Sequence, residues 1–418
     1  MTATRNSRRH PRTPGVAGHQ ADAAHQQADA ARLPAVAVRL PAVAVRRSAG
    51  FVRQLAAEPR RPTRARRRMP PLDPAAFTTV DLDEDGWLLA PDTGEPVPAD
   101  RLTDHLATWL RPPPWATDIV VYVHGWRTGD RAAVRNAQRL LALCHQQRSH
   151  RPHLYPRLYA AGCAPWAPWT VVVRWPSSSR ISYNGYYAIR RRAHAMSAPG
   201  KGYAPHVLGH LLGYLDAERG DPRADTLVTS SGQYLHLVGH SFGGRFLCEA
   251  VRWAATAGDT LTWSIATHPS RPFTIDSLTA FQMAAPTNAF DGTFRALRPD
   301  VCGHQVPLGG PMVFTHSRHD RATGYCHLHA EHLPGIGHSG MRLSPARGDL
   351  APNDVWHTRL LRADTPYPRA CLDHPFVNID ASWRYRNTRL NPIGAHSDYF
   401  HPESAHLLLS LAEWSRPE

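Results

Sequence analysis

The run from Tyr234 to Arg245 constrains the fold of this chain more than any other stretch. Residues 234–238 have the β-type side chains of a buried strand, and residues 245–255 are compatible with a helix. The turn between them reads Gly239-His240-Ser241-Phe242-Gly243, a Gly-x-Ser-x-Gly pattern between strand and helix. Its glycines leave room where side chains would collide, and the helix N-terminus turns backbone N–H groups towards the serine. We therefore predict that Ser241 is a nucleophile; the alternative is an ordinary glycine-rich β–α turn.

From residue 71 onward the chain alternates between strand-like and helix-like segments. Five further runs have the continuous apolar character of buried strands: 118–126, 170–175, 278–285, 311–316 and 375–380. Residues 130–147 and 403–414 read as helices, and residues 81–89 as an opening hairpin. The alternation predicts one α/β domain, residues 71–418, with a mostly parallel central sheet and helices on both faces. Sites in such sheets lie at the carboxyl ends of strands.

The basic charge of the chain is concentrated in residues 1–70. This segment holds 15 Arg against 3 acidic residues, and it supplies most of the formal net charge of +14. It also contains two consecutive copies of Leu-Pro-Ala-Val-Ala-Val-Arg, in which the prolines exclude a continuous helix. We expect a disordered Arg/Pro/Ala-rich tail, or an over-extended gene start with translation beginning at Met69. The alternative is an arm that binds nucleic acid or an anionic surface, but the nearly neutral body makes nucleic acid an unexpected partner.

We expect neither a secretory signal nor a membrane span in this sequence. The N-terminus lacks the apolar core and early cleavage site of a secretory signal, and no stretch approaches the roughly 20 apolar residues of a membrane span. The six cysteines are scattered without Cys-x-x-Cys spacing. We therefore expect free thiols and a cytoplasmic protein.

An oxyanion hole requires backbone donors that are in place before the reaction begins. Phe242, directly after the serine, supplies one N–H group, and the second is expected from the loop after an earlier strand. His124-Gly125-Trp126 occupies that place after the strand-like run from residue 118. We predict the Trp126 N–H as the second donor, with Gly125 permitting close approach; the alternative is that His124-Gly125 forms only a turn.

The acid and the base are expected after the serine, in that order. Asp320 follows the strand-like run 311–316, where a carboxylate can orient an imidazole, and Asp291 after the preceding run is its rival. His396 lies in a loop between the last strand and the closing helix. His401 and His406 are less suitable bases because they fall at the start of that helix and inside it.

Three other patterns suggest sites that we do not expect to function. Residues 337–340, Gly-His-Ser-Gly, resemble the nucleophile turn, but Met341 stands at the fifth position and no strand precedes them. Cys326, His329 and His332 could hold zinc, although histidine is abundant throughout the chain. Acidic residues in 81–85 are spaced somewhat like a calcium loop that lacks its final glutamate. We predict no metal site.

Together these motifs resemble the α/β-hydrolase superfamily, in particular its esterase- or lipase-like bacterial members. The resemblance covers roughly residues 115–415 and implies a triad of Ser241, Asp320 and His396, with Trp126 and Phe242 as oxyanion donors. Segments 177–229 and 322–372 are longer than such a fold requires, so both are candidates for a cap or lid.

The sequence therefore predicts a serine hydrolase that cleaves a carboxylic ester through an acyl-enzyme intermediate, without a cofactor. The expected substrate is a small-molecule or lipid-like ester. One alternative is a thioesterase, amidase, acyltransferase or haloperoxidase on the same fold. Another is a non-catalytic binding protein with a basic arm.

Overall fold

The computed structural model describes residues 73–159, 166–198, 202–219, 233–256, 274–298, 301, 308–344, 355–386 and 391–416. All of them belong to one compact unit, Arg67–Glu418. The expected tail, its basic arm and the alternative start at Met69 lie outside the described residues.

The described strands form one sheet in the order β2-β1-β4-β3-β5-β6-β7-β9-β8. Every neighbouring pair is parallel except the antiparallel pair β1–β2. The strands are β1 Phe77–Leu82, β2 Leu88–Leu89, β3 Asp118–Val123, β4 Pro168–Arg174, β5 Tyr234–His240, β6 Ser277–Phe281, β7 Met312–His316, β8 Val355–Arg359 and β9 Phe376–Asp380.

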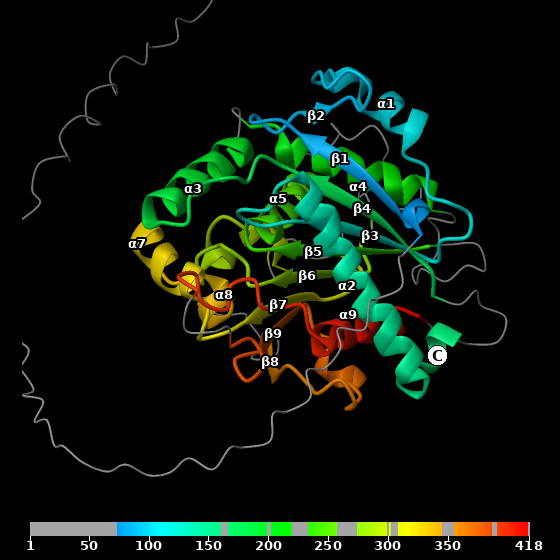
Figure 1. Ribbon diagram of the computed structural model, residues 1–418, viewed down its shortest axis with the longest axis vertical. Coiled ribbons are helices and arrows are strands. Elements are labelled where there is room, and N and C mark those ends of the chain that lie inside the picture. The colour runs from blue at the N-terminus through cyan, green and yellow to red at the C-terminus, as the bar shows by residue number, and fades with distance from the viewer. Residues whose placement is uncertain are drawn as a thin grey trace, which may run out of the picture. The chain divides into compact units, whose positions relative to one another are not determined.

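Helices cover both faces of this sheet (Figure 1). On one face α2 packs beside α9, and on the other α4 packs beside α5. Helix α3 and the short helices α7 and α8 gather at the edge where the central strands end (Figure 1). The helices are α1 Leu102–Trp109, α2 Asp130–His150, α3 Tyr183–Ser197, α4 Ala204–Glu218, α5 Phe242–Thr256, α7 His327–Glu331, α8 Ile336–Ser339 and α9 Pro402–Trp414.

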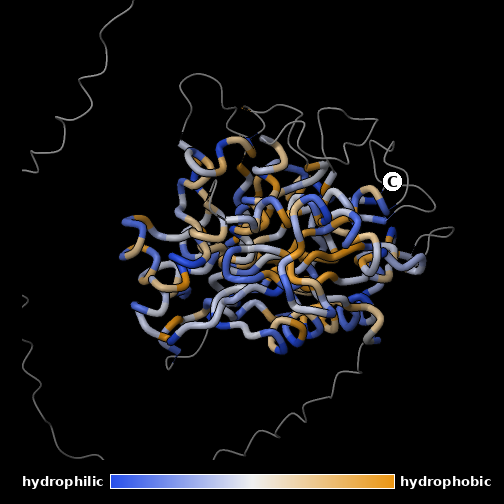
Figure 2. The backbone as a smooth tube through the Cα atoms, turned by 90° about the horizontal axis from the view of Figure 1, so that it is seen from above, coloured by the Kyte–Doolittle hydropathy of each residue, from blue (hydrophilic) through white to orange (hydrophobic). Residues whose placement is uncertain are grey.

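The core lies on both sides of the central strands. Alternate residues of β3 face opposite layers, so that Val121 joins the apolar cluster beneath α4 and α5 and Tyr122 joins the one beneath α2 and α9. In Figure 2 the hydrophobic segments, coloured orange, are concentrated towards the middle of the described unit. Burial on both faces explains why these strands read as continuous apolar runs rather than alternating ones.

The predicted fold class is confirmed as a mostly parallel α/β sheet with helices on both faces, which is compatible with the α/β-hydrolase fold. The expected opening hairpin is the antiparallel pair β1–β2. Two predicted strands were too long. The run 118–126 ends at Val123, and the run 278–285 ends at Phe281 because Gln282 adopts a left-handed backbone, with φ of 48°.

Among the described residues, no helix is both long and apolar enough to span a bilayer.

Candidate active site

Ser241 stands alone between two regular elements, because β5 ends at His240 and α5 begins at Phe242. Its φ of 56° places it in the left-handed region, which a residue with a side chain adopts at a cost. The backbone stays in that turn because the Ser241 N–H donates to the Phe281 carbonyl at 3.0 Å and the Ser241 carbonyl accepts from Ala284. The serine is therefore held in a strained, fully enclosed turn at the carboxyl end of the sheet.

The motif glycines allow β3 to approach this turn closely. A Cβ atom on Gly243 would overlap the Val123 carbonyl, and one on Gly239 would overlap Gly244. A Cβ on Gly125 would lie 2.7 Å from the Cβ of Ser241. These positions require glycine because other segments already occupy the space.

Ser241, His396 and Asp320 form a continuous chain of hydrogen bonds. His396 Nδ1 lies 2.9 Å from Asp320 Oδ2, and His396 Nε2 lies 2.8 Å from Ser241 Oγ. Since an ionised carboxylate only accepts, Nδ1 carries the proton and Nε2 accepts from the serine hydroxyl. This is the tautomer that a general base requires.

Backbone pairing holds the acid loop against the base loop. Asp320 and Gly394 form an antiparallel bridge, and the Ala395 N–H donates to the His319 carbonyl at 2.9 Å. Gly394 has a φ of 63°, and a side chain there would overlap His319. The register of these two loops thus places the carboxylate beside the imidazole.

Asp320 remains ionised despite complete burial. Burial alone raises the pKa of its carboxyl, but the charge and hydrogen bond of His396 and the hydrogen bonds from Thr323 outweigh it, so the pKa lies below its ordinary value. Oδ1 accepts from the Thr323 N–H at 3.0 Å. The site therefore contains a fixed negative charge aimed at the imidazole.

Of the two predicted oxyanion donors, Phe242 follows Ser241 in the chain, and Trp126 belongs to a loop that approaches Ser241 in space. Phe242 is the first residue of α5, so its N–H has no acceptor within the helix. Trp126 follows Gly125, whose backbone approaches Ser241. Within the described residues neither of these two N–H groups donates to another atom, so both remain available for an oxyanion.

Two buried neutral histidines support the serine turn and the loop that contains Gly125. Burial lowers the pKa of His124 to about 4, and its Nε2 accepts from the Trp175 N–H at 3.2 Å while Nδ1 donates to the Gly125 carbonyl. Burial, followed by the charge of His396, lowers the pKa of His240 to about 3. His240 Nε2 donates to the His396 carbonyl at 2.7 Å, which ties the serine turn to the base loop.

The rival acid and bases are engaged elsewhere. Asp291 accepts from Arg298 at 2.9 Å, and His401 contacts Asp398 at 3.0 Å. His406 lies between the Tyr155 hydroxyl and the Thr365 carbonyl. The structure brings none of the three to Ser241.

The Gly-His-Ser-Gly pattern lies against the loop that carries Asp320, where His338 Nδ1 is 3.0 Å from the Asp320 carbonyl. Ser339 ends the short helix α8 rather than following a strand. In the described part of the chain, no group of three or more His, Cys, Asp or Glu side chains could hold a metal ion. The side chains of Cys326, His329 and His332 therefore do not form such a group. Asp83 instead accepts from the backbone of Asp85 and Trp87 within the first hairpin.

A layer formed by α3 and α7 adjoins the closed site. Ser241 is 0% exposed and His396 is 1% exposed. From α3, Tyr186 packs against the rings of Trp126 and Phe242, and its hydroxyl lies 2.8 Å from His327 Nδ1 on α7. The bond between Arg190 and Glu331 joins the same two helices at 2.5 Å.

A short π-helix, Ala322–Cys326, connects Asp320 to α7. π-Helical turns are rare and occur frequently at functional sites. The layer formed by α3 and α7 is thus attached directly to the loop that carries Asp320.

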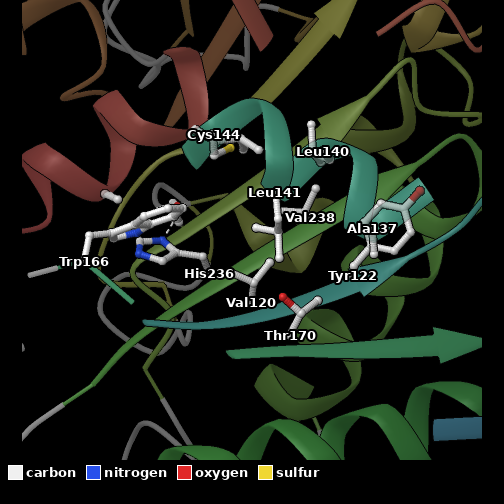
Figure 3. Close-up of a pocket in the computed structure, with 13 residues that line it drawn as sticks. Val120, Tyr122, Ala137, Leu140, Leu141, Cys144, Trp166, Thr170, His236 and Val238 are labelled. Atoms are coloured by element: carbon white, nitrogen blue, oxygen red, sulfur yellow. Dashed lines mark hydrogen bonds between the residues drawn. The ribbon is translucent and has the colours of Figure 1, made fainter. Parts of the chain in front are cut away.

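An apolar pocket beneath α2 and α9 is separate from this site (Figure 3). It has a volume of about 30 Å³, against the ~10–15 Å³ that one water needs, so it is too small for an ester substrate. Beside it His236 lies 2.8 Å from the Ser277 hydroxyl and 3.2 Å from Asp118. Ser277, His236 and Asp118 thus form a second hydrogen-bonded chain. Arg416 contacts both carboxylate oxygens of Asp118 at its end.

Sequence reasoning missed one residue of the site, Gln282. Its side-chain Nε2 donates to Asp320 Oδ2 at 3.3 Å and to the Ala395 carbonyl at 2.9 Å. A glutamine inside an apolar strand-like run carries no local signal for such a position.

Comparisons with known proteins identify no relative that bears on this site. No family model matches the chain, and no curated protein matches it. A solved structure similar to it is "Crystal Structure of TT1662 from Thermus thermophilus", with 12% identity over 72% of this chain and 91% of that one. The TM-score of 0.31 is too low for an inference of shared function.

Proposed function

We propose that this protein is a serine hydrolase that cleaves a carboxylic ester. One observation carries the proposal, the hydrogen-bonded chain from Ser241 through His396 to Asp320, which begins at a left-handed serine. Strained residues persist where the surrounding structure determines them, and they cluster at active sites. The two available N–H groups of Trp126 and Phe242 supply the second requirement, a place for negative charge.

The first half of the reaction is acylation of the serine. His396 Nε2 takes the hydroxyl proton while Ser241 Oγ attacks the ester carbonyl carbon. Negative charge then develops on the carbonyl oxygen, where the two N–H donors stabilise it, and Asp320 stabilises the imidazolium. The bond from carbon to the alcohol oxygen breaks, and the alcohol leaves with the proton from His396.

The second half releases the acid. A water molecule gives a proton to His396 and attacks the acyl carbon, and Ser241 recovers that proton as its bond to the acyl group breaks. The net change is one ester and one water converted into one acid and one alcohol. Every proton passes through His396.

The surface around the covering layer favours an apolar substrate. Large apolar side chains are exposed in and just before α3, and in the π-helix, α7 and the turn that follows it: Ile181, Tyr183, Tyr187, Tyr325, Leu328 and Leu333. The Tyr183 hydroxyl lies 3.5 Å from the His329 carbonyl, so the exposed side chains of α3 lie next to those of α7. Clustered apolar exposure of this kind is typical of binding surfaces, and we propose a small-molecule or lipid-like ester.

Labelling with a fluorophosphonate probe tests the proposal, because such probes react with an activated serine. We expect the wild type and Ser339→Ala to be labelled and Ser241→Ala to remain unlabelled. Ser339 is the matched control, since it also follows a Gly-His pair. Equal labelling of Ser241→Ala would remove Ser241 from the mechanism, and a folded wild type without labelling would end the proposal. A panel of esters, thioesters and amides then identifies the preferred leaving group.

The closed site leads to a prediction about access. Tyr186→Phe keeps the aromatic packing but removes the hydroxyl that contacts His327, so the contact between α3 and α7 weakens by about 1 kcal/mol. If opening precedes labelling, the labelling rate constant rises about fivefold. Tyr187→Phe is the control because Tyr187 is the next residue and is exposed. Equal rates for both variants and the wild type would mean that this contact does not limit access.

A further inference from the structure

The turn after β6 repeats the geometry of the serine turn one strand away. Gln282 directly follows Phe281, the last residue of β6, just as Ser241 follows the last residue of β5. Its φ is 48°, and its N–H donates to the Thr315 carbonyl of β7 at 3.1 Å. The side chain is 0% exposed. A buried, left-handed glutamine is an unfavourable choice unless its side chain has a use.

The side-chain amide joins the acid loop to the base loop. Its Nε2 donates to Asp320 Oδ2 at 3.3 Å and to the Ala395 carbonyl at 2.9 Å. Both partners are acceptors, so the orientation of the amide is fixed: the opposite orientation would place Oε1 of Gln282 against a carboxylate. Ala395 immediately precedes His396, and one amide group therefore contacts the Asp320 carboxylate and the backbone next to His396.

Glutamine occupies this position in spite of an unsatisfied group. Its Oε1 is buried and has no partner among the described residues. A methionine of similar length would avoid that cost, so packing alone does not explain the residue. The N–H donors of the amide are what distinguish glutamine from an apolar residue at this position.

We propose that Gln282 is a positioning residue of the triad, which holds the Asp320 carboxylate and the His396 loop in register. Asp320 Oδ2 accepts from both His396 Nδ1 and Gln282 Nε2, while Oδ1 accepts from Thr323. These donors fix the plane of the carboxylate, and through it the direction of the imidazole. The inference rests on the proposed hydrolase function, which it extends from three side chains to four.

Two substitutions and one matched control test the inference. Gln282→Met removes the donor at nearly constant size, and Gln282→Glu places a second carboxylate beside Asp320. Gln233→Met is the control, because Gln233 is also a buried amide whose Nε2 donates to two backbone carbonyls, those of Pro113 and Ala116. Circular dichroism and thermal unfolding establish that each variant folds. If Gln282→Met does not fold, Gln282→Glu tests the inference.

The expected result is a change in the chemistry of the pair and not only in stability. Gln282→Met should lower kcat for an ester about 10- to 100-fold with little change in KM, whereas Gln233→Met should not. In Gln282→Glu the like charge disfavours ionisation of Asp320, so the acid limb of the kcat/KM profile should move to higher pH. Unchanged kcat and an unchanged pH profile in both Gln282 variants, or an equal loss in Gln233→Met, would overturn the inference.

A measurement without substrate separates this inference from the proposed function. The His396 Nδ1 proton should give a low-field NMR resonance, assigned by its loss in His396→Gln. We expect Gln282→Met and Gln282→Glu to shift or broaden it, and Gln233→Met to leave it unchanged. A wild type without labelling or turnover would defeat the hydrolase proposal, whereas an unmoved resonance in folded Gln282 variants would defeat the positioning role.

Discussion

Replacing Ser241 with alanine is expected to lower kcat for a carboxylic ester by about a million-fold and to leave the fold intact. Alanine removes only the hydroxyl oxygen, and the turn that holds residue 241 is fixed by backbone bonds to Phe281 and Ala284. His396→Ala should cost about as much. The measurement is kcat under saturating substrate, with circular dichroism to confirm the fold.

The double variant supplies the sharper part of this prediction. Residues that act as a unit show non-additive losses, so Ser241→Ala combined with His396→Ala should be no slower than either alone. Asp320→Asn should lose about 10⁴-fold, because an amide facing His396 Nδ1 favours the wrong tautomer. Additive losses in the double variant would show that Ser241 and His396 do not act in one step.

Removing the guanidinium of Arg416 is expected to destabilise the protein by about 3–5 kcal/mol. Asp118 is fully buried at the start of β3, and Arg416 Nη2 lies 2.7 Å from its Oδ2. Among the described residues, Arg416→Gln would leave the carboxylate with Thr117 and His236 as its side-chain partners. The double variant Asp118→Asn/Arg416→Gln should recover much of the loss, since it also removes the buried charge. Urea unfolding measures each free energy.

An exposed ion pair and the pH dependence of stability provide the controls. Arg111→Gln removes the ion pair with Glu218, and because the Arg111 side chain is 79% exposed, the loss in free energy of unfolding should be under about 1 kcal/mol. Burial raises the pKa of Asp118, but Arg416 and His236 together lower it below its ordinary value. The stability from this carboxylate is therefore present above its unfolded pKa of about 4 and is lost as the pH falls further. A similar acid dependence in Asp118→Asn would contradict this account.

The strands that position the site could be predicted because each is buried on both faces. The runs 170–175, 311–316 and 375–380 agree with β4, β7 and β9 to within two residues, since continuous apolar stretches of that length are strands in a parallel sheet. The serine turn could be located because its glycines and serine are adjacent in sequence. The turn itself is formed by five consecutive residues.

The remaining partners could be predicted only through chain order. The structure brings Asp320 and His396 to Ser241, and it places Asp291 elsewhere, but their catalytic role stays a prediction until activity is measured. Gln282 could not be anticipated, because its use depends on three loops that meet only in the folded chain.

The edge strand β8 was missed for a different reason. Residues 355–359 fall within the segment 322–372, which the sequence suggested as an insertion. Their side chains are half-buried or exposed, so the strand lacks an apolar run and is defined by its pairing with β9. Helices α7 and α8 of the same segment lie at the carboxyl edge of the sheet instead.

The contact between Asp118 and Arg416 also has a consequence for biosynthesis. The two residues are 298 positions apart. At roughly 5–20 residues per second, the ribosome needs about 15 to 60 s to make Arg416 after it has made Asp118. For that time the start of β3 carries a carboxylate without its counter-ion, which favours hydration over burial. The centre of the sheet should therefore close only after Arg416 has been made, and the nascent chain has that interval in which to engage a chaperone.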